Sequence, residues 1–258
     1  MLLEGKNAVV YGAGGHVGSA VARAFAREGA RVYLAGRTLS KLQVVATEIA
    51  AAGGAAEAAR VDALDPQGIE RHLSVIVKEA GRIDISFNAI GIRGDLQGTP
   101  LIEMPCEDFT LPVLTGVKTH FLTATAAARH MVRQGSGVIL TLSSSSAVLS
   151  GRDRRYHLTG GFSTACAAIE ALSRSLAGEL GPMGIRVVCL RPNAIPETWT
   201  GDAESARVKT YMENGTVLGR LPTLDEVAHA AVWMASDRAS AMTGTIANLT
   251  CGSIMDST

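Results

Sequence analysis

The residues of this sequence that are best suited to chemistry begin with a glycine-rich run near its start. The run separates a short apolar segment from a helical pattern and comprises Gly12, Ala13, Gly14, Gly15, His16, Val17 and Gly18. Glycine permits a tight turn there, and the free N–H groups at the start of a helix can bind a pyrophosphate. We therefore predict a nucleotide-binding turn, with a merely tight strand-to-helix connection as the alternative.

A second position with chemical meaning is Arg37, which follows the next apolar run within Gly36-Arg37-Thr38. An Asp or Glu at this place would favour a free ribose 2′-hydroxyl, whereas an arginine suits a 2′-phosphate. No acidic residue ends this run, so the sequence favours NADP over NAD as the nucleotide. The alternative is that Arg37 is a solvated loop residue.

A polar stretch, residues 151–157, holds the third group of candidates. Its arginines are Arg152, Arg154 and Arg155. Such a cluster could attract a carboxylate or phosphate of a substrate. Tyr156 and His157 could move a proton, since imidazole exchanges protons close to neutral pH. The alternative is a solvated polar loop at the mouth of a pocket.

Short apolar runs alternate with helical patterns along the whole chain. The expected strands are Asn7–Tyr11, Arg31–Ala35, Ala56–Arg60, Ile83–Asn88, Val138–Leu142, Arg186–Leu190 and Thr245–Leu249. They are mostly apolar on both sides of the pleat, which is typical of strands covered by helices on both faces. We predict one α/β domain over residues 1–258, a Rossmann-like, doubly wound parallel sheet of about seven strands with helices on both faces. The less regular stretches are Gly91–Thr110, Gly151–Gly161 and Pro192–Pro222, and we expect substrate loops in the last two, which follow strands of the sheet.

Composition excludes several classes of function. The 24 basic and 24 acidic side chains cancel, which argues against a protein that binds nucleic acid. The four cysteines form no C-x-x-C pair, so we expect reduced thiols in a cytoplasmic protein and no metal site. The chain has no apolar stretch of about 18 residues and its first apolar run is too short for a signal peptide, so we expect no membrane contact.

Taken in order, these motifs resemble the short-chain dehydrogenase/reductase family over nearly the whole chain. Residues 167–180 (AAIEALSRSLAGEL) are similar to the family's long helix, and residues 219–244 are similar to its C-terminal region. The resemblance implies an oxidoreductase that moves a hydride between a nicotinamide cofactor and a carbonyl or alcohol. It further implies cofactor contacts from the glycine turn and from Asp62, Ala63, Asn88, Ala89, Gly91, Pro192 and Asn193.

The resemblance also implies a catalytic Ser, a Tyr, a Lys four residues after the Tyr, and an Asn. Ser144 matches the Ser, but Phe162 and Cys166 stand where the Tyr and the Lys are expected. The Asn is absent too, and residues 116–118 are the nearest equivalent. Phenylalanine has no proton to give, and a thiol carries no fixed positive charge. Cys166 therefore reads as a small buried side chain rather than a nucleophile.

Tyr156 and His157 are the alternative proton donors. Tyr156 lies 13 positions after Ser143, the family's usual spacing, but Gly160 stands four residues after it instead of Lys. His157 needs no neighbouring Lys and is the better candidate. The leading hypothesis is an NADP-dependent oxidoreductase with a changed proton donor, which forms a homodimer or homotetramer. The alternatives are a nucleotide-binding pseudoenzyme that acts as a sensor or scaffold, and cofactor-free chemistry like that of the halohydrin dehalogenases.

Overall fold

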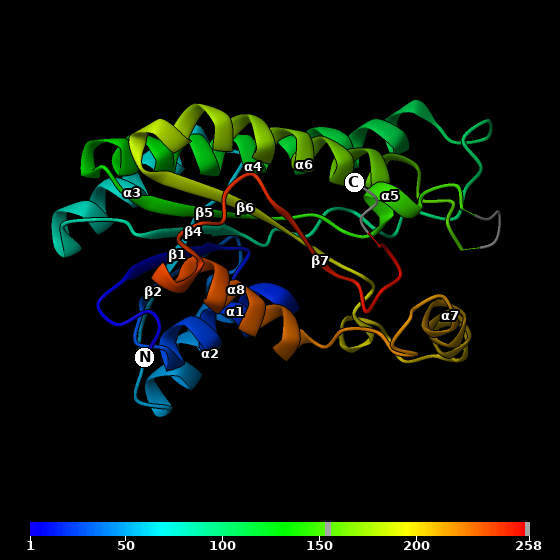
Figure 1. Cartoon of the computed structure of the whole chain (residues 1–258), viewed down its shortest axis with the longest axis horizontal. Coiled ribbons are helices and arrows are strands. Elements are labelled where there is room, and N and C mark those ends of the chain that lie inside the picture. The colour runs from blue at the N-terminus through cyan, green and yellow to red at the C-terminus, as the bar shows by residue number, and fades with distance from the viewer. Residues whose placement is uncertain (153–155, 256–258) are drawn as a thin grey trace.

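Seven parallel strands form one sheet in the computed structural model, which describes residues 1–152 and 156–255. Their order across the sheet is β3-β2-β1-β4-β5-β6-β7 (Figure 1). The strands are β1 (Asn7–Tyr11), β2 (Arg31–Gly36), β3 (Ala55–Arg60), β4 (Ile85–Asn88), β5 (Gly137–Leu142), β6 (Ile185–Pro192) and β7 (Ile246–Leu249). The predicted parallel, doubly wound sheet is confirmed, and every predicted strand is present with its ends moved by at most two residues.

The two edge strands differ from the expectation of burial on both faces. Side chains of β3 alternate between exposed and half-buried, and all four residues of β7 are half-buried. Each of these strands has a partner on one side only, since β3 pairs with β2 and β7 pairs with β6. The central strands β1, β4 and β5 are buried almost throughout, as predicted.

Helices cover both faces of the sheet, with α3, α4 and α6 above it and α1, α2 and α8 below it in Figure 1. The helices are α1 (His16–Arg27), α2 (Leu39–Ala51), α3 (Pro66–Ala80), α4 (Cys106–Gln134), α5 (Ser146–Leu149), α6 (Gly160–Leu180), α7 (Ala203–Asn214) and α8 (Leu224–Ala235). Short 3-10 turns lie at Gly181–Met183, Pro196–Thr198 and Asp237–Ala239. Helix α7 lies within a stretch that we expected to be irregular, because Asp202 caps it by accepting a hydrogen bond from the N–H of Ser205.

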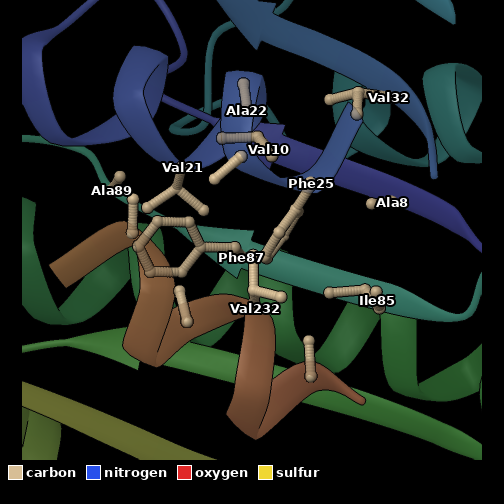
Figure 2. Close-up of a cluster of buried hydrophobic side chains, with 14 of the residues drawn as sticks. Ala8, Val10, Val21, Ala22, Phe25, Val32, Ile85, Phe87, Ala89 and Val232 are labelled. Atoms are coloured by element: carbon tan, nitrogen blue, oxygen red, sulfur yellow. The ribbon is translucent and has the colours of Figure 1, made fainter. Parts of the chain in front are cut away.

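Two separate cores hold the layers together. The lower core packs α1, α2 and α8 against the sheet, and Figure 2 shows Phe25 of α1 and Phe87 of β4 beside Val232 of α8. The upper core packs α3, α4 and α6 against the other face. Because Phe25 and Phe87 are fully buried, the lower core fixes helix α1, and with it the glycine turn at the helix start.

The carboxyl ends of the parallel strands meet at one edge, where α/β proteins of this kind bind their ligands. Along this edge, the loops after β2, β1 and β4 are neighbours in the strand order. The segments after β5 and β6 follow beyond β4. In the part of the chain that the structure describes, no helix is long and apolar enough to cross a membrane.

Candidate functional site

The glycine turn after β1 is shaped by close approach of the backbone. Gly12 has a φ of 76°, and a Cβ there would lie 2.7 Å from the carbonyl oxygen of Ala89. A Cβ on Gly18 would collide with the carbonyl oxygen of Gly12, so only glycine fits either position. The cap of α1 is Gly15, so no side-chain cap hydrogen bond from the described residues occupies the first N–H groups of the helix.

A cleft of about 560 Å³ opens beside this turn, at the carboxyl ends of β1, β2 and β4. The predicted nucleotide contacts that line it are Gly12, Gly14, Gly15, Arg37, Asp62, Ala63, Ala89 and Gly91. The predicted contacts that do not line it are His16, Val17, Gly18, Asn88, Pro192 and Asn193. His16 is exposed and Gly18 is buried against Gly12, so these two shape the turn rather than the cleft wall.

Charge in this cleft is mainly positive. Arg37, Lys41 and Arg93 line it, whereas Asp62 is its one carboxylate among the described lining residues. Asp62 accepts a hydrogen bond from the N–H of Leu64 at 3.0 Å, and Arg93 is paired with Asp95 outside the lining. Lys41 was missed from the sequence; it lies in the first turn of α2, whereas Arg37 lies in the bend before that helix.

Asn88 does not line the cleft but stabilises the loop that forms its wall. Its amide donates a hydrogen bond to Thr123 Oγ1 at 2.9 Å, and its carbonyl oxygen accepts one from the N–H of Ile90 at 2.9 Å. The side chain is only 3% exposed. Asn88 therefore holds the loop after β4 in place while Ala89 and Ile90 form the cleft wall.

The first two serines after β5 differ in burial. Ser143 is buried and donates a hydrogen bond to Glu170 Oε1 at 2.8 Å. Ser144 is half-buried, and its nearest side-chain partner, Ser146 Oγ, lies 3.5 Å away. Ser144 thus has a hydroxyl that is only weakly engaged within the protein.

Helix α6 carries the two residues at the positions expected for Tyr and Lys. Phe162 is half-buried in its first turns, and Cys166 is fully buried one turn later. Burial, with a further contribution from the nearby Glu170, raises the pKa of the Cys166 thiol to about 12. The thiol is therefore neutral and protonated, which agrees with its interpretation as a small buried side chain.

A second pocket, of about 340 Å³, lies between the segment after β5 and helix α7. It is lined by Leu149, Arg152, His157, Asn193, Tyr211, Met212, Asn214, Gly215 and Ser253. His157 is 8% exposed, and its ring centroid lies 6.1 Å from that of Tyr211. Two of the predicted arginines, Arg154 and Arg155, lie outside the described residues.

Tyr156 does not line this second pocket. Its ring packs on Tyr211 of α7, with centroids 4.5 Å apart. The structure thus places both candidate donors beside α7 and neither in the cleft at the glycine turn. The path of this segment depends on contacts far apart in sequence, such as the hydrogen bond from the N–H of Gly98 to the carbonyl of Leu158.

Asn193 connects the second pocket to the serines. Its side-chain oxygen accepts a hydrogen bond from Ser145 Oγ at 2.9 Å, and its amide donates one to Ser253 Oγ at 3.0 Å. The carbonyl of Pro192 accepts a bond from the N–H of Ser145 at 2.8 Å. Pro192 and Asn193 therefore position the segment after β5, one residue from Ser144.

His120 of α4 is a functional candidate that the sequence did not reveal. Its side chain is 1% exposed, and Nδ1 lies 2.9 Å from the carbonyl oxygen of Gly116, one turn earlier. Nε2 lies 3.4 Å from the N–H of Leu142 and accepts from it when the ring is neutral. Burial lowers the pKa of His120 to about 4, so the ring is neutral near pH 7.

Gly116 is the first residue of the segment 116–118 that is the nearest equivalent of the missing Asn. A Cβ there would lie 3.2 Å from Ile92 Cγ1 and 3.5 Å from the Cβ of Ala165. The space that an Asn side chain would need is therefore taken by Ile92 and by helix α6. His120 instead links α4 to the end of β5.

A buried ion pair behind the serines was also missed. Arg191 of β6 donates to both oxygens of Glu170, with Nη2 to Oε2 at 2.5 Å and Nε to Oε1 at 2.7 Å. Arg191 also donates to Asn248 Oδ1 at 3.0 Å, and Glu170 accepts the bond from Ser143. This network joins α6, β5, β6 and β7 behind Ser144. Within the described residues, no group of three or more His, Cys, Asp or Glu side chains could hold a metal ion.

Known proteins resemble this chain over almost its full length. A family model described as enoyl-(acyl carrier protein) reductase matches residues 12–253. The chain is 33% identical over 250 residues to L-rhamnose 1-dehydrogenase (NAD(P)(+)) of Azotobacter vinelandii, with 95% of this chain and 94% of that protein covered. It is 29% identical over 254 residues to 7alpha-hydroxysteroid dehydrogenase of Escherichia coli strain K12, with 98% and 96% covered. A crystal structure of a short-chain type dehydrogenase/reductase from Mycobacterium marinum superposes with a TM-score of 0.86 at 35% identity, with 97% and 96% covered.

Proposed function

The chain belongs to the short-chain dehydrogenase/reductase family, and we propose that it is an NADP-dependent oxidoreductase acting on a carbonyl or alcohol. The observation that carries the proposal is the positively charged cleft beside the glycine turn. The relatives include dehydrogenases for a sugar and for a steroid, so the reaction class is supported while the substrate is not fixed by similarity.

The residues of the cleft fit a dinucleotide. No side chain can occupy the floor at Gly12, and the first N–H groups of α1 have no side-chain cap, which suits a pyrophosphate. Arg37 follows β2 and Lys41 lies in the first turn of α2, and both line the cleft where a 2′-phosphate of NADP would be held. When bound, NADP supplies or accepts the hydride that is exchanged with the substrate carbon.

For the proton, we propose His157 as the donor and Ser144 as the group that orients the substrate oxygen. His157 lines the second pocket, whereas Tyr156 packs on Tyr211 outside its lining. The neutral thiol of Cys166 can neither donate effectively nor stabilise a developing negative charge. Replacing His157 by Ala should lower kcat by about 10²–10⁴-fold, and Tyr156→Phe should change it little.

The first experiment is a thermal-shift titration with NADPH, NADP, NADH, NAD and ADP. A nucleotide at about 100 times its Kd should raise the melting temperature by roughly 5–10 °C. Arg37→Ser should weaken NADPH binding by about tenfold or more and leave NADH binding unchanged. Arg27→Ser is the matched control, because Arg27 is exposed at the end of α1 and does not line the cleft.

A screen of carbonyl compounds with NADPH then tests turnover. Hydride transfer with NADPH supports the full proposal. Nucleotide binding without turnover of any compound would leave a binding protein that acts as a sensor or scaffold. The absence of a shift with every nucleotide would refute the proposal outright.

We also propose that two copies associate through the outer faces of α4 and α6. Ala167 and Ala171 of α6 are exposed, and Leu114 and Phe121 of α4 are 65% and 49% exposed. Apolar surface of this kind favours association in a symmetric homo-oligomer. Light scattering on the purified protein tests this, and Phe121→Glu should shift the distribution toward monomer.

A further inference from the structure

The second pocket is unlike the nucleotide cleft in its charge. Among the described residues that line it, Arg152 is the one side chain with a permanent charge, and no carboxylate is present. The other polar groups in the lining belong to His157, Asn193, Tyr211, Asn214 and Ser253. Among these described lining residues the one permanent charge is positive, which favours a negatively charged ligand.

Arg152 is placed so that its charge reaches the pocket. Arg152 lies three residues after the end of α5, and its backbone N–H donates a hydrogen bond to the carbonyl of Leu149 at 3.1 Å. Its Nη1 lies 3.9 Å from the position a Cβ would take on Gly215, at the end of α7. The exposed Arg152 side chain therefore reaches from the segment after β5 to the end of α7. None of the carboxylates in the described part of the chain forms an ion pair with it.

The rest of the lining sets the size and character of a ligand. A volume of about 340 Å³ is at the lower end of the range for small-molecule sites. Leu149 and Met212 provide apolar walls, whereas Asn214 provides an amide on the same side as Gly215. The amide and carbonyl of Asn193 are already bonded to Ser253 and Ser145. Arg152 is therefore the strongest anchor available to a ligand.

We propose that the second pocket binds a small substrate that carries an oxyanionic group, a carboxylate or a phosphate, against the guanidinium of Arg152. The inference rests on the proposed oxidoreductase function for its assignment of the pocket to the substrate. Binding of the anion itself does not require turnover. A planar guanidinium can donate two parallel hydrogen bonds to either kind of oxyanion, so one residue accounts for the preference.

The competing explanation is structural. The C-terminal end of α7 has a partial negative charge, and Arg152 lies near it, so the side chain could serve only to hold α7 in place. A residue with that role alone would affect charged and neutral ligands equally. The two explanations are therefore separated by comparing ligands that share a skeleton and differ in charge.

The test measures binding to the full-length protein, with and without saturating NADP, by calorimetry or ligand-observed NMR. The probes are mandelate with its neutral counterpart phenylethanediol, and phenyl phosphate with its neutral counterpart phenol. Wild-type protein should bind at least one anion about tenfold more tightly than its neutral counterpart. Arg152→Gln should remove this preference and Arg152→Lys should keep part of it. Arg207→Gln is the matched control on α7, since Arg207 pairs with the exposed Glu204 and does not line the pocket.

Each outcome decides the inference. Preference for mandelate alone assigns a carboxylate substrate, and preference for phenyl phosphate alone assigns a phosphate. Equal binding of charged and neutral probes, binding of none of them, or a preference that survives Arg152→Gln would overturn the inference. A uniform loss for all probes with a lower melting temperature in Arg152→Gln would leave Arg152 only the structural role. A parallel turnover assay keeps the two proposals apart, because an Arg152-dependent preference without hydride transfer removes only the oxidoreductase.

Discussion

Removing one partner of the buried pair of Glu170 and Arg191 should strongly destabilise the fold. The Glu170 and Arg191 side chains are 5% and 9% exposed, and they share two hydrogen bonds. Glu170→Gln removes the carboxylate charge beside the buried guanidinium. Breaking a pair of this kind costs about 3–5 kcal/mol.

The expected change in melting temperature follows from chain length. At roughly 2.1 cal/mol/K per residue, 258 residues give an unfolding entropy of roughly 540 cal/mol/K. A loss of about 3–5 kcal/mol then corresponds to a melting temperature lower by about 6–9 °C. Urea denaturation and calorimetry at pH 7 measure the two quantities independently.

A control and a double variant make the reasoning refutable. Glu204 and Arg207 are 64% and 66% exposed, so Glu204→Gln should cost less than about 0.5 kcal/mol. The double variant Glu170→Leu with Arg191→Met should lose clearly less than the sum of the single losses, since no charge stays buried alone. A Glu170→Gln variant within about 1 kcal/mol of wild type would show that the pair does not act as a buried, coupled unit.

Three further substitutions test other parts of the site. Phe162→Tyr with Cys166→Lys should raise NADPH-dependent carbonyl reduction at least about tenfold, and no gain in the assay would mean that the nicotinamide is not held beside α6. Since burial lowers the pKa of His120 to about 4 against 6.5 for a free His, the folded state loses stability as pH falls from 6.5 toward 4. His120 contributes about 2 kcal/mol to this loss at pH 5. Burial lowers the pKa of His72 to about 4 as well, so urea denaturation at pH 7 and 5 should show a loss in both proteins that is about 2 kcal/mol smaller in His120→Gln. Gly161→Ala places a Cβ against the backbone of α4 and should cost about 2–3 kcal/mol in the same assay, whereas Gly178→Ala, with open space around it, should be neutral or stabilising.

The sheet and its caps could be predicted because their signals are local. Short apolar runs set the strands, and a Thr followed three residues later by a Glu, at Thr223 and Glu226, forms a capping box with both hydrogen bonds made. An Asp followed by a Pro, at Asp65 and Pro66, likewise starts helix α3. These features depend on residues within one or two turns of each other.

The network behind the serines could not be predicted for the opposite reason. Glu170 and Arg191 are 21 positions apart on different elements, and Asn248 is 57 positions from Arg191. Nothing in the periodicity of α6 marks Glu170, because the other buried side chains on that face of the helix are apolar or small. Only the fold brings these side chains together, so no local pattern could have shown that a carboxylate is buried there.

The positions of the two pockets along the edge of the sheet indicate where the proposed reaction would take place. The loop after β4 lines the nucleotide cleft, with Asn88 fixed behind it, and Asn193 lines the second pocket while bonded to Ser145. Ser144 lies next to Ser145 at the end of β5, which is the strand between β4 and β6. A hydride donor held in the first cleft and a substrate held in the second would therefore meet at the carboxyl end of β5. The buried Glu170–Arg191 pair holds this strand end through Ser143, so the proposed reaction would depend on the same network as the stability of the fold.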